Sequence, residues 1–170
     1  EILFSSGDPS YITCIRSSLK PFQASTLIKY NGHKKLKLTN KELSLICASH
    51  SAEKVHTDTV IKILKKIKCD NNDLACGAHP AYDLHTRHAM LKKNIPFSNI
   101  HNNCSGKHVG MLALAKTLEA NHKNYINKDH IVQKKIFDNI LQYTKVDPHN
   151  FSIDGCSVPT PFYSLHTMAK

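Results

Sequence analysis

The chain has 170 residues, of which 41% are hydrophobic and 21% charged, values typical of a globular protein that exclude wholesale disorder. Its longest apolar run, residues 111–115, is far shorter than the roughly 20 residues needed to cross a membrane, so we expect no membrane partner. The length suits a single domain over residues 1–170.

The net charge is +10, from 23 basic and 13 acidic residues. Such an excess is common in proteins that bind nucleic acids, because clustered cations release counterions from phosphates. Only Arg16 and Arg87 are arginines, however, and arginine is the residue that base recognition favours. Because no nucleic-acid-binding motif is present, a basic nucleic-acid-binding module is the weakest interpretation, and we expect no nucleic acid partner.

Six cysteines are spread along the chain without a Cys-x-x-Cys pair, at positions 14, 47, 69, 76, 104 and 156. A chain of this length can bury a core without disulfide bonds. We therefore expect reduced thiols and a cytoplasmic protein.

The first elements in chain order are a hairpin and several helices. Residues 2–4 and 11–15 are β-prone runs separated by a turn cluster, which predicts the hairpin. Apolar spacing predicts a helix over 18–29, Thr39 to Glu42 form a capping box that opens a short helix, and a longer helix is predicted over 51–68.

Three more helices are predicted, near 83–93, over 105–119 and over 130–143, and residues 151–161 are predicted to be a turn-rich loop. The predicted strands are too few to form an independent sheet. The chain also begins with Glu1 rather than Met, so we expect it to be a fragment of a longer protein.

Ser17 and Lys20 form a Ser-x-x-Lys pattern at the start of a predicted helix. Residues three apart share a helix face, so the amine of a desolvated Lys20 can take the proton of the Ser17 hydroxyl. The same spacing occurs in penicillin-recognising acyl-transfer enzymes. Residues 51–54 match it too, so spacing alone favours a capping serine beside an exposed lysine.

The densest polar cluster, residues 101–108, leads directly into an apolar helix, and such a helix N-terminus is suited to binding carboxylates. Cys104 and Cys156 would form half of a metal site if they meet in space, completed by Lys107, His108 or Asp154. Taken alone, two further polar runs are interpreted as structural: residues 48–53 as a helix N-cap and residues 76–80 as a plain turn.

Together these segments resemble one family, the type II (Rhizobium-like, thermolabile) L-asparaginases. The matching segments are Arg16–Gln23, Cys47–Ser51, Cys76–His79, Asn102–His108 and Asp154–Cys156, in the family's order and spacing. The resemblance implies hydrolysis of L-asparagine to L-aspartate and ammonia. It also implies an α/β (α+β) fold similar to that of serine β-lactamases and glutaminases, with a helical cluster beside an antiparallel sheet, incomplete in this chain.

The resemblance also assigns roles to residues. It implies that Ser17 is the nucleophile, Lys20 its base and Ser49 a second active-site hydroxyl. It implies that the substrate is bound by Asp154, Asn103 and His50. Of these, Asp154 would hold the substrate's α-ammonium group. A zinc ion near the substrate would be held by three others: Cys104, Lys107 and Cys156.

The chain departs from the family pattern at Ala52 and Ser157, where glycine is usual, and in the order Pro80-Ala81 after His79. Family members are roughly twice as long, so we expect the 170-residue chain to cover about half of one and to be inactive alone. The expected partner is L-asparagine, with a homodimer left open. The alternative from another class is a degenerate, non-catalytic relic that binds a small amino acid or a metal.

Overall fold

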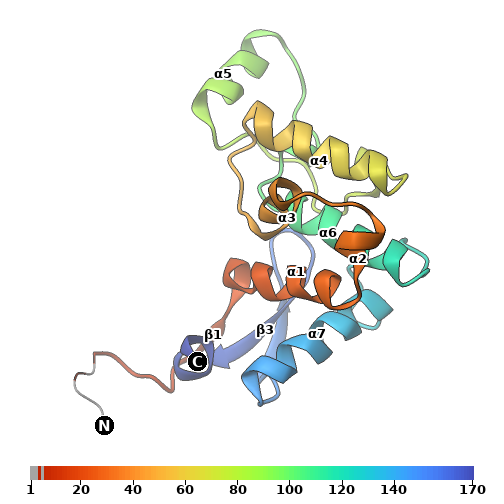
Figure 1. Cartoon of the computed structure of the whole chain (residues 1–170). Coiled ribbons are helices and arrows are strands. Elements are labelled where there is room, and N and C mark those ends of the chain that lie inside the picture. Colours follow the sequence, from red (N-terminus) through yellow and green to blue (C-terminus); the bar gives the residue numbers. More distant parts are fainter. Residues whose placement is uncertain (1–3, 5) are drawn as a thin grey trace.

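The computed structural model describes residue 4 and residues 6–170, which form helices beside a small antiparallel sheet (Figure 1). The expected α/β fold class is confirmed. The α-helices are α1 (Lys20–Lys29), α2 (Gly32–Lys35), α3 (Asn40–Cys47), α4 (Lys54–Lys66), α5 (Leu84–Lys92), α6 (Ser105–Thr117), α7 (Ile131–Thr144) and α8 (Leu165–Ala169). The strands β1 (Ile12–Cys14), β2 (Asn150–Ile153) and β3 (Pro159–Ser164) pair in the order β1-β3-β2. Among the helices described, none is long and apolar enough to span a membrane.

Helix α6 forms the centre of the helical cluster, in contact with α1, α3, α4 and α7 (Figure 1). All but one of its residues are buried, including the polar ones of its first turn. A Cβ atom at Gly106 would collide with the backbone carbonyl of Leu45, and one at Gly110 with the side chain of Ile46. These two glycines therefore allow α3 to approach α6 closely.

The predicted helices are present with small shifts at their ends. A 3₁₀ turn, η1 (Arg16–Leu19), precedes α1, so Ser17 lies at a helix start as predicted. The capping box of α3 is formed: the Thr39 hydroxyl accepts from the backbone of Glu42, and the Glu42 carboxylate accepts from the backbone of Thr39. The same carboxylate lies 2.7 Å from Lys66 Nζ, which ties α3 to α4.

Helix α4 begins three residues later than the predicted start at residue 51. Ala52 has a φ of +68°, a left-handed conformation that a helix cannot contain. The polar run before it therefore stays extended, and its side chains are directed by tertiary contacts instead of by helical periodicity.

The predicted loop over residues 151–161 is wrong, because this region forms the β2–β3 hairpin. The loop was predicted from the turn residues Asp154 and Gly155, and β3 also contains prolines 159 and 161, which cannot donate hydrogen bonds within a sheet. The register of β1 with β3 ends at Phe162, however, and beyond it Pro161 only accepts, from the Ile15 N–H at 3.2 Å, so neither proline has to donate to β1.

The predicted N-terminal hairpin is not formed by the described residues. Strand β1 pairs with β3 at the other end of the sequence. Of the expected partner strand, residues 2 and 3 lie outside the described residues.

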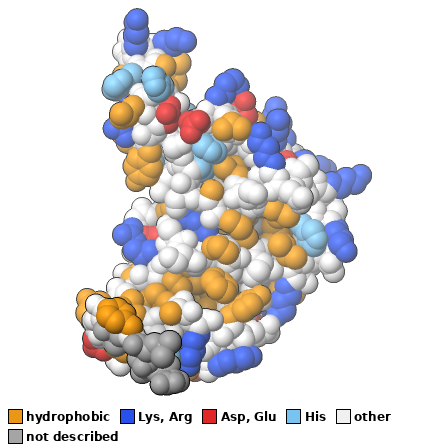
Figure 2. All heavy atoms as spheres, turned by 60° about the vertical axis from the view of Figure 1, so that its left-hand side comes forward, with side chains coloured by type: hydrophobic (Ala, Val, Ile, Leu, Met, Phe, Trp, Pro, Cys, Tyr) orange, Lys and Arg blue, Asp and Glu red, His pale blue; other side chains and the backbone are white. Residues whose placement is uncertain are grey.

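Figure 2 shows hydrophobic side chains gathered over the middle and lower part of one face, with Lys and Arg side chains spread around its edges. Several of the exposed large hydrophobic residues belong to the sheet or adjoin it: Tyr11, Ile12, Ile153 and Leu165. The basic residues on this face therefore form no single patch of the kind that phosphate backbones need.

The turn between β2 and β3 generates a prediction about stability. Ser157 has a φ of +69°, and among the described contacts its hydroxyl makes no hydrogen bond. Ser157→Gly should raise the free energy of unfolding by about 0.5–1 kcal/mol in urea denaturation, because glycine adopts this conformation without strain. Ser157→Val is the matched control and should lower it, since a β-branched residue is strongly disfavoured there. Equal stability of the two variants would contradict this account.

Candidate active site

A surface pocket lies where η1, the segment 79–82, the start of α6 and the β2–β3 turn meet. It joins four segments that the sequence separates widely. Its wall is formed by Arg16, Ser17, His79, Tyr82, Asn102, Asn103, Cys104, Asp154, Gly155 and Cys156. Of the nine predicted site residues, five line this wall: Ser17, Asn103, Cys104, Asp154 and Cys156.

Lys20 is almost completely buried, with 1% of its surface exposed, although it begins α1. Its Nζ donates to Ser49 Oγ at 2.7 Å and to the carbonyl oxygen of Ala48 at 3.0 Å. Burial lowers the pKa of Lys20, and the nearby ammonium of Lys107 lowers it further. The structure thus holds a lysine with weakened proton affinity against a serine hydroxyl.

Ser17 is exposed and faces the pocket, but no hydrogen bond joins its hydroxyl to Lys20 within the described part of the chain. The reason is that the Lys20 side chain turns toward the residues that follow α3. Ser49 is exposed as well and lies outside the pocket wall. Lys20 therefore bonds the second hydroxyl and not the one three residues before it.

The two thiols of the pocket wall are buried and close enough to influence each other. Hydrogen bonding from the Cys104 thiol lowers the pKa of Cys156, and Lys107 adds to this effect by donating to Cys156 Sγ at 2.9 Å. The same hydrogen bond raises the pKa of Cys104, so Cys156 is the more readily ionised thiol of the two. All six cysteines are free, which agrees with the expected reduced thiols.

Asp154 closes the other side of the pocket with a carboxylate that is already paired. Arg16 donates to its Oδ1 from Nε at 3.1 Å and from Nη2 at 2.8 Å. The Arg16 side chain is 66% exposed and that of Asp154 only 8%, so the arginine can move while the carboxylate stays in place. One basic residue, Arg16, and one acidic residue, Asp154, therefore lie together in the pocket wall.

Asn103 lies in the wall, where its backbone N–H donates to His79 Nε2 at 3.0 Å. His79 Nδ1 in turn donates to the carbonyl oxygen of Pro80 at 2.7 Å. The side chain of Asn102, the residue before Asn103, donates to the carbonyl oxygens of Cys76 and Gly77. These contacts fix the 76–80 segment against the start of α6.

His50 lies behind the wall with 3% of its surface exposed. Its Nδ1 accepts from the backbone of Ala52 at 3.1 Å, so Nε2 carries the ring proton toward Ser105 Oγ, 2.7 Å away. Both ring nitrogens are thus occupied by the protein, and His50 holds the first turn of α6 in position.

Four wall residues were not selected as site residues from the sequence: Arg16, His79, Tyr82 and Asn102. Three of them belong to the motif segments, so their position in those motifs was the available signal. Tyr82 gave no such signal, because it lies outside the motif segments and only the fold brings it into the wall.

The environment of His50 generates a prediction about acid stability. Burial lowers the pKa of His50 to about 4, from 6.5. The unfolded chain binds the proton more readily, so the free energy of unfolding should fall as the pH drops from about 6.5 to about 4, by an amount on the order of 3 kcal/mol. In His50→Gln this loss should become smaller, as measured by urea denaturation at pH 4, 5.5 and 7. An equally steep loss in the variant would assign it to other groups.

Two comparisons place the chain among known proteins. The family model described as L-asparaginase II matches residues 1–170, the whole of the chain. The comparison with curated proteins gives no match. Membership of this family suggests asparagine amidohydrolase activity and binding of L-asparagine. The chain therefore belongs to the L-asparaginase II family, as its motifs indicated.

Proposed function

We propose that the protein hydrolyses L-asparagine to L-aspartate and ammonia in the pocket beside Ser17. The observation that carries the proposal is the buried Lys20, whose lowered pKa and contact with a serine hydroxyl suit a general base. Lys20 begins α1, three residues after Ser17, which lines the pocket.

In the proposed reaction, neutral Lys20 takes the proton of the Ser17 hydroxyl as the Ser17 oxygen attacks the side-chain amide carbon. Ser49 holds the lysine amine and can relay the proton. The C–N bond then breaks, ammonia leaves with a proton from Lys20, and water hydrolyses the ester to free L-aspartate. Hydrogen bonds between such groups tighten when substrate binds, which would close the gap between Ser17 and Lys20.

The charged pair at the mouth suits the two ends of an amino acid. Asp154 would bind the α-ammonium group of L-asparagine, and the displaced Arg16 would bind its α-carboxylate. Asn103 would orient the substrate from the opposite wall. His50 contributes indirectly in this arrangement, because it positions α6.

The donor chemistry at the back of the pocket fits a zinc ion: two buried thiols and the Lys107 amine, which already lies 2.9 Å from Cys156 Sγ. Cys104, Lys107 and Cys156 would hold the ion, with Lys107 giving up its proton. A bound zinc ion would supply a Lewis acid that orients the substrate.

The first test replaces the proposed nucleophile and base. Ser17→Ala should lower the turnover number by roughly a thousandfold or more, because no attacking oxygen remains. Lys20→Arg should fail nearly as badly, since a guanidinium group cannot accept the proton. The measurement is ammonia release from L-asparagine, with L-glutamine for comparison, by the product of the complete reading frame and by the 170-residue chain.

Ser18→Ala is the matched control, because Ser18 is the exposed neighbour of Ser17 and lies outside the pocket wall. It should keep wild-type activity. If Ser17→Ala keeps its activity while Ser49→Ala has none, the nucleophile is Ser49 and the proposed roles of the two serines are reversed.

The protonation state of Lys20 gives a second test. Only the neutral amine is a base, so kcat/KM should rise with pH. The apparent pKa of this rise should lie below the 10.5 of an ordinary lysine, because burial lowers the pKa of Lys20. L-aspartate formation measured from pH 6 to 11 reports it. An apparent pKa of 10.5 or higher would remove Lys20 from the role of base.

The alternative, a non-catalytic protein that binds a small amino acid, rests on the same Asp154–Arg16 pair. It predicts heat of binding for L-asparagine in calorimetry without any L-aspartate formed. Turnover that depends on Ser17 excludes it.

A further inference from the structure

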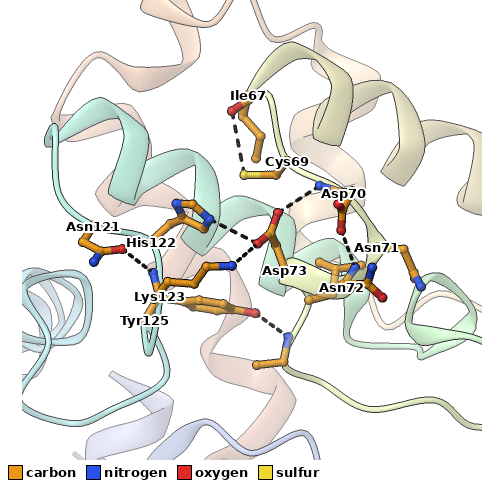
Figure 3. A network of polar contacts seen from close by, with 12 residues as sticks. Ile67, Cys69, Asp70, Asn71, Asn72, Asp73, Asn121, His122, Lys123 and Tyr125 are labelled. Atoms are coloured by element: carbon orange, nitrogen blue, oxygen red, sulfur yellow. Dashed lines mark hydrogen bonds and ion pairs between the residues drawn. The ribbon is translucent and has the colours of Figure 1, made fainter.

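A second group of side chains that could bind a metal lies outside the pocket wall, and Figure 3 shows it from close by. Cys69 follows α4, Asp73 ends the 3₁₀ turn η2 (Asn71–Asp73), and His122 belongs to the loop between α6 and α7. One ligand atom from each, a sulfur, a carboxylate oxygen and a ring nitrogen, lies within 4.8 Å of the other two. All three residues are partly buried.

The backbone fixes two of these side chains in place. Asp73 Oδ2 accepts from the backbone N–H of Asp70 at 3.0 Å, which leaves Oδ1 directed at His122 Nε2, 3.1 Å away. The Cys69 thiol donates to the backbone carbonyl oxygen of Ile67 at 3.8 Å (Figure 3), and the Cys69 N–H donates to the carbonyl oxygen of Leu64 near the end of α4. The cluster therefore needs little backbone movement to close around an ion.

The ligand types select a class of metal. A thiolate, an imidazole and a carboxylate form a three-ligand set of the kind that binds zinc with an open fourth position. The sulfur disfavours Mg²⁺ and Ca²⁺, which take oxygen ligands. The Oδ1–Nε2 separation of 3.1 Å is close to the edge of a tetrahedron around zinc with bonds of about 2.0–2.1 Å.

We propose that Cys69, Asp73 and His122 form a binding site for a zinc-class divalent ion, separate from the thiols of the pocket. The Cys69 thiol gives its proton to solvent as the sulfur binds the ion, and the ring proton of His122 moves from Nε2 to Nδ1, which frees Nε2 to bind. A water molecule completes the tetrahedron.

Two lysines compete with the ion. Lys123 Nζ donates to Asp73 Oδ1 at 2.9 Å, and its side chain is 67% exposed, so it can turn into solvent. Lys116 Nζ lies 3.2 Å from His122 Nδ1, which must carry the ring proton once Nε2 binds metal. Both ammonium groups weaken metal binding, so removing Lys123 strengthens it.

The ion would join the segment after α4 to the α6–α7 loop. Within that loop, Tyr125 accepts from the backbone of Ala75 at 2.9 Å and contacts His108 Nδ1 at 2.6 Å (Figure 3 shows the first of these contacts). His108 follows Lys107 in α6, so the site supports the helix that carries Lys107 and begins directly after Cys104.

The test titrates the protein with Co²⁺, a spectroscopic substitute for zinc, in a Cys104→Ser/Cys156→Ser background that removes the pocket thiols. We expect a thiolate-to-cobalt absorption band that saturates at one ion per chain. Cys69→Ser should abolish it, whereas Cys47→Ser, which removes another partly buried thiol, should leave it unchanged. His122→Ala should weaken Co²⁺ binding by roughly tenfold or more.

Lys123→Met should strengthen Co²⁺ binding several-fold, while Lys128→Met in the same loop should not. Should the background variant fail to fold, the otherwise unchanged protein is loaded with Zn²⁺, and Cys69→Ser should then bind one ion fewer per chain. The proposal is overturned by the absence of the band in the folded background variant, by its survival in Cys69→Ser, or by an unchanged zinc content in that variant.

Discussion

The close approach of α3 to α6 is the contact on which the site depends. Without a side chain at Gly106, the backbone at Leu45 can lie directly against the first turn of α6. This brings His50 to Ser105 and joins its backbone N–H to the carbonyl oxygen of Asn103 at 3.2 Å. The polar residues after α3 and those before α6 thereby meet behind one pocket. A larger residue at position 106 would separate the two halves of the site.

Burial and hydrogen bonding then set the pKa values of the ionisable groups near that contact. Lys20 and Lys107 are both almost fully buried, and Cys156 Sγ accepts from Lys107. Burial lowers the pKa of Lys20, and the Lys107 ammonium lowers it further. Hydrogen bonds from Cys104 and Lys107 lower the pKa of Cys156, against the opposing effect of its own burial. Desolvation thus favours a neutral lysine base, and hydrogen bonding favours an anionic sulfur beside the pocket.

Three of the ten described non-glycine residues with positive φ lie around the site. Arg16, Ala52 and Ser157 all have positive φ, and each lies next to a site residue or within the polar run after α3. Non-glycine residues in this conformation persist only where surrounding contacts hold them, and such positions gather at functional sites. Ala52 has no exposed surface, so packing holds it, while Ser157 is held by the hairpin turn.

The sequence by itself determined the helices, the capping box at Thr39, the reduced thiols and the family, because these depend on periodicity and on motifs within short segments. It also identified five residues of the pocket wall through the motifs that contain them. The β2–β3 hairpin was not predictable, since two prolines are tolerated in β3 only because β1 stops pairing at Phe162.

The tertiary structure alone decided which groups meet. Lys20 bonds Ser49, 29 positions away, and not the serine three positions before it, because burial turns its side chain toward the end of α3. Cys69, Asp73 and His122 carry no recognisable spacing, and the loop after α6 brings them together. Periodicity describes neighbours within a few residues, whereas these contacts join segments separated by 29 to 49 positions, whose meeting depends on the packing of the whole helical cluster.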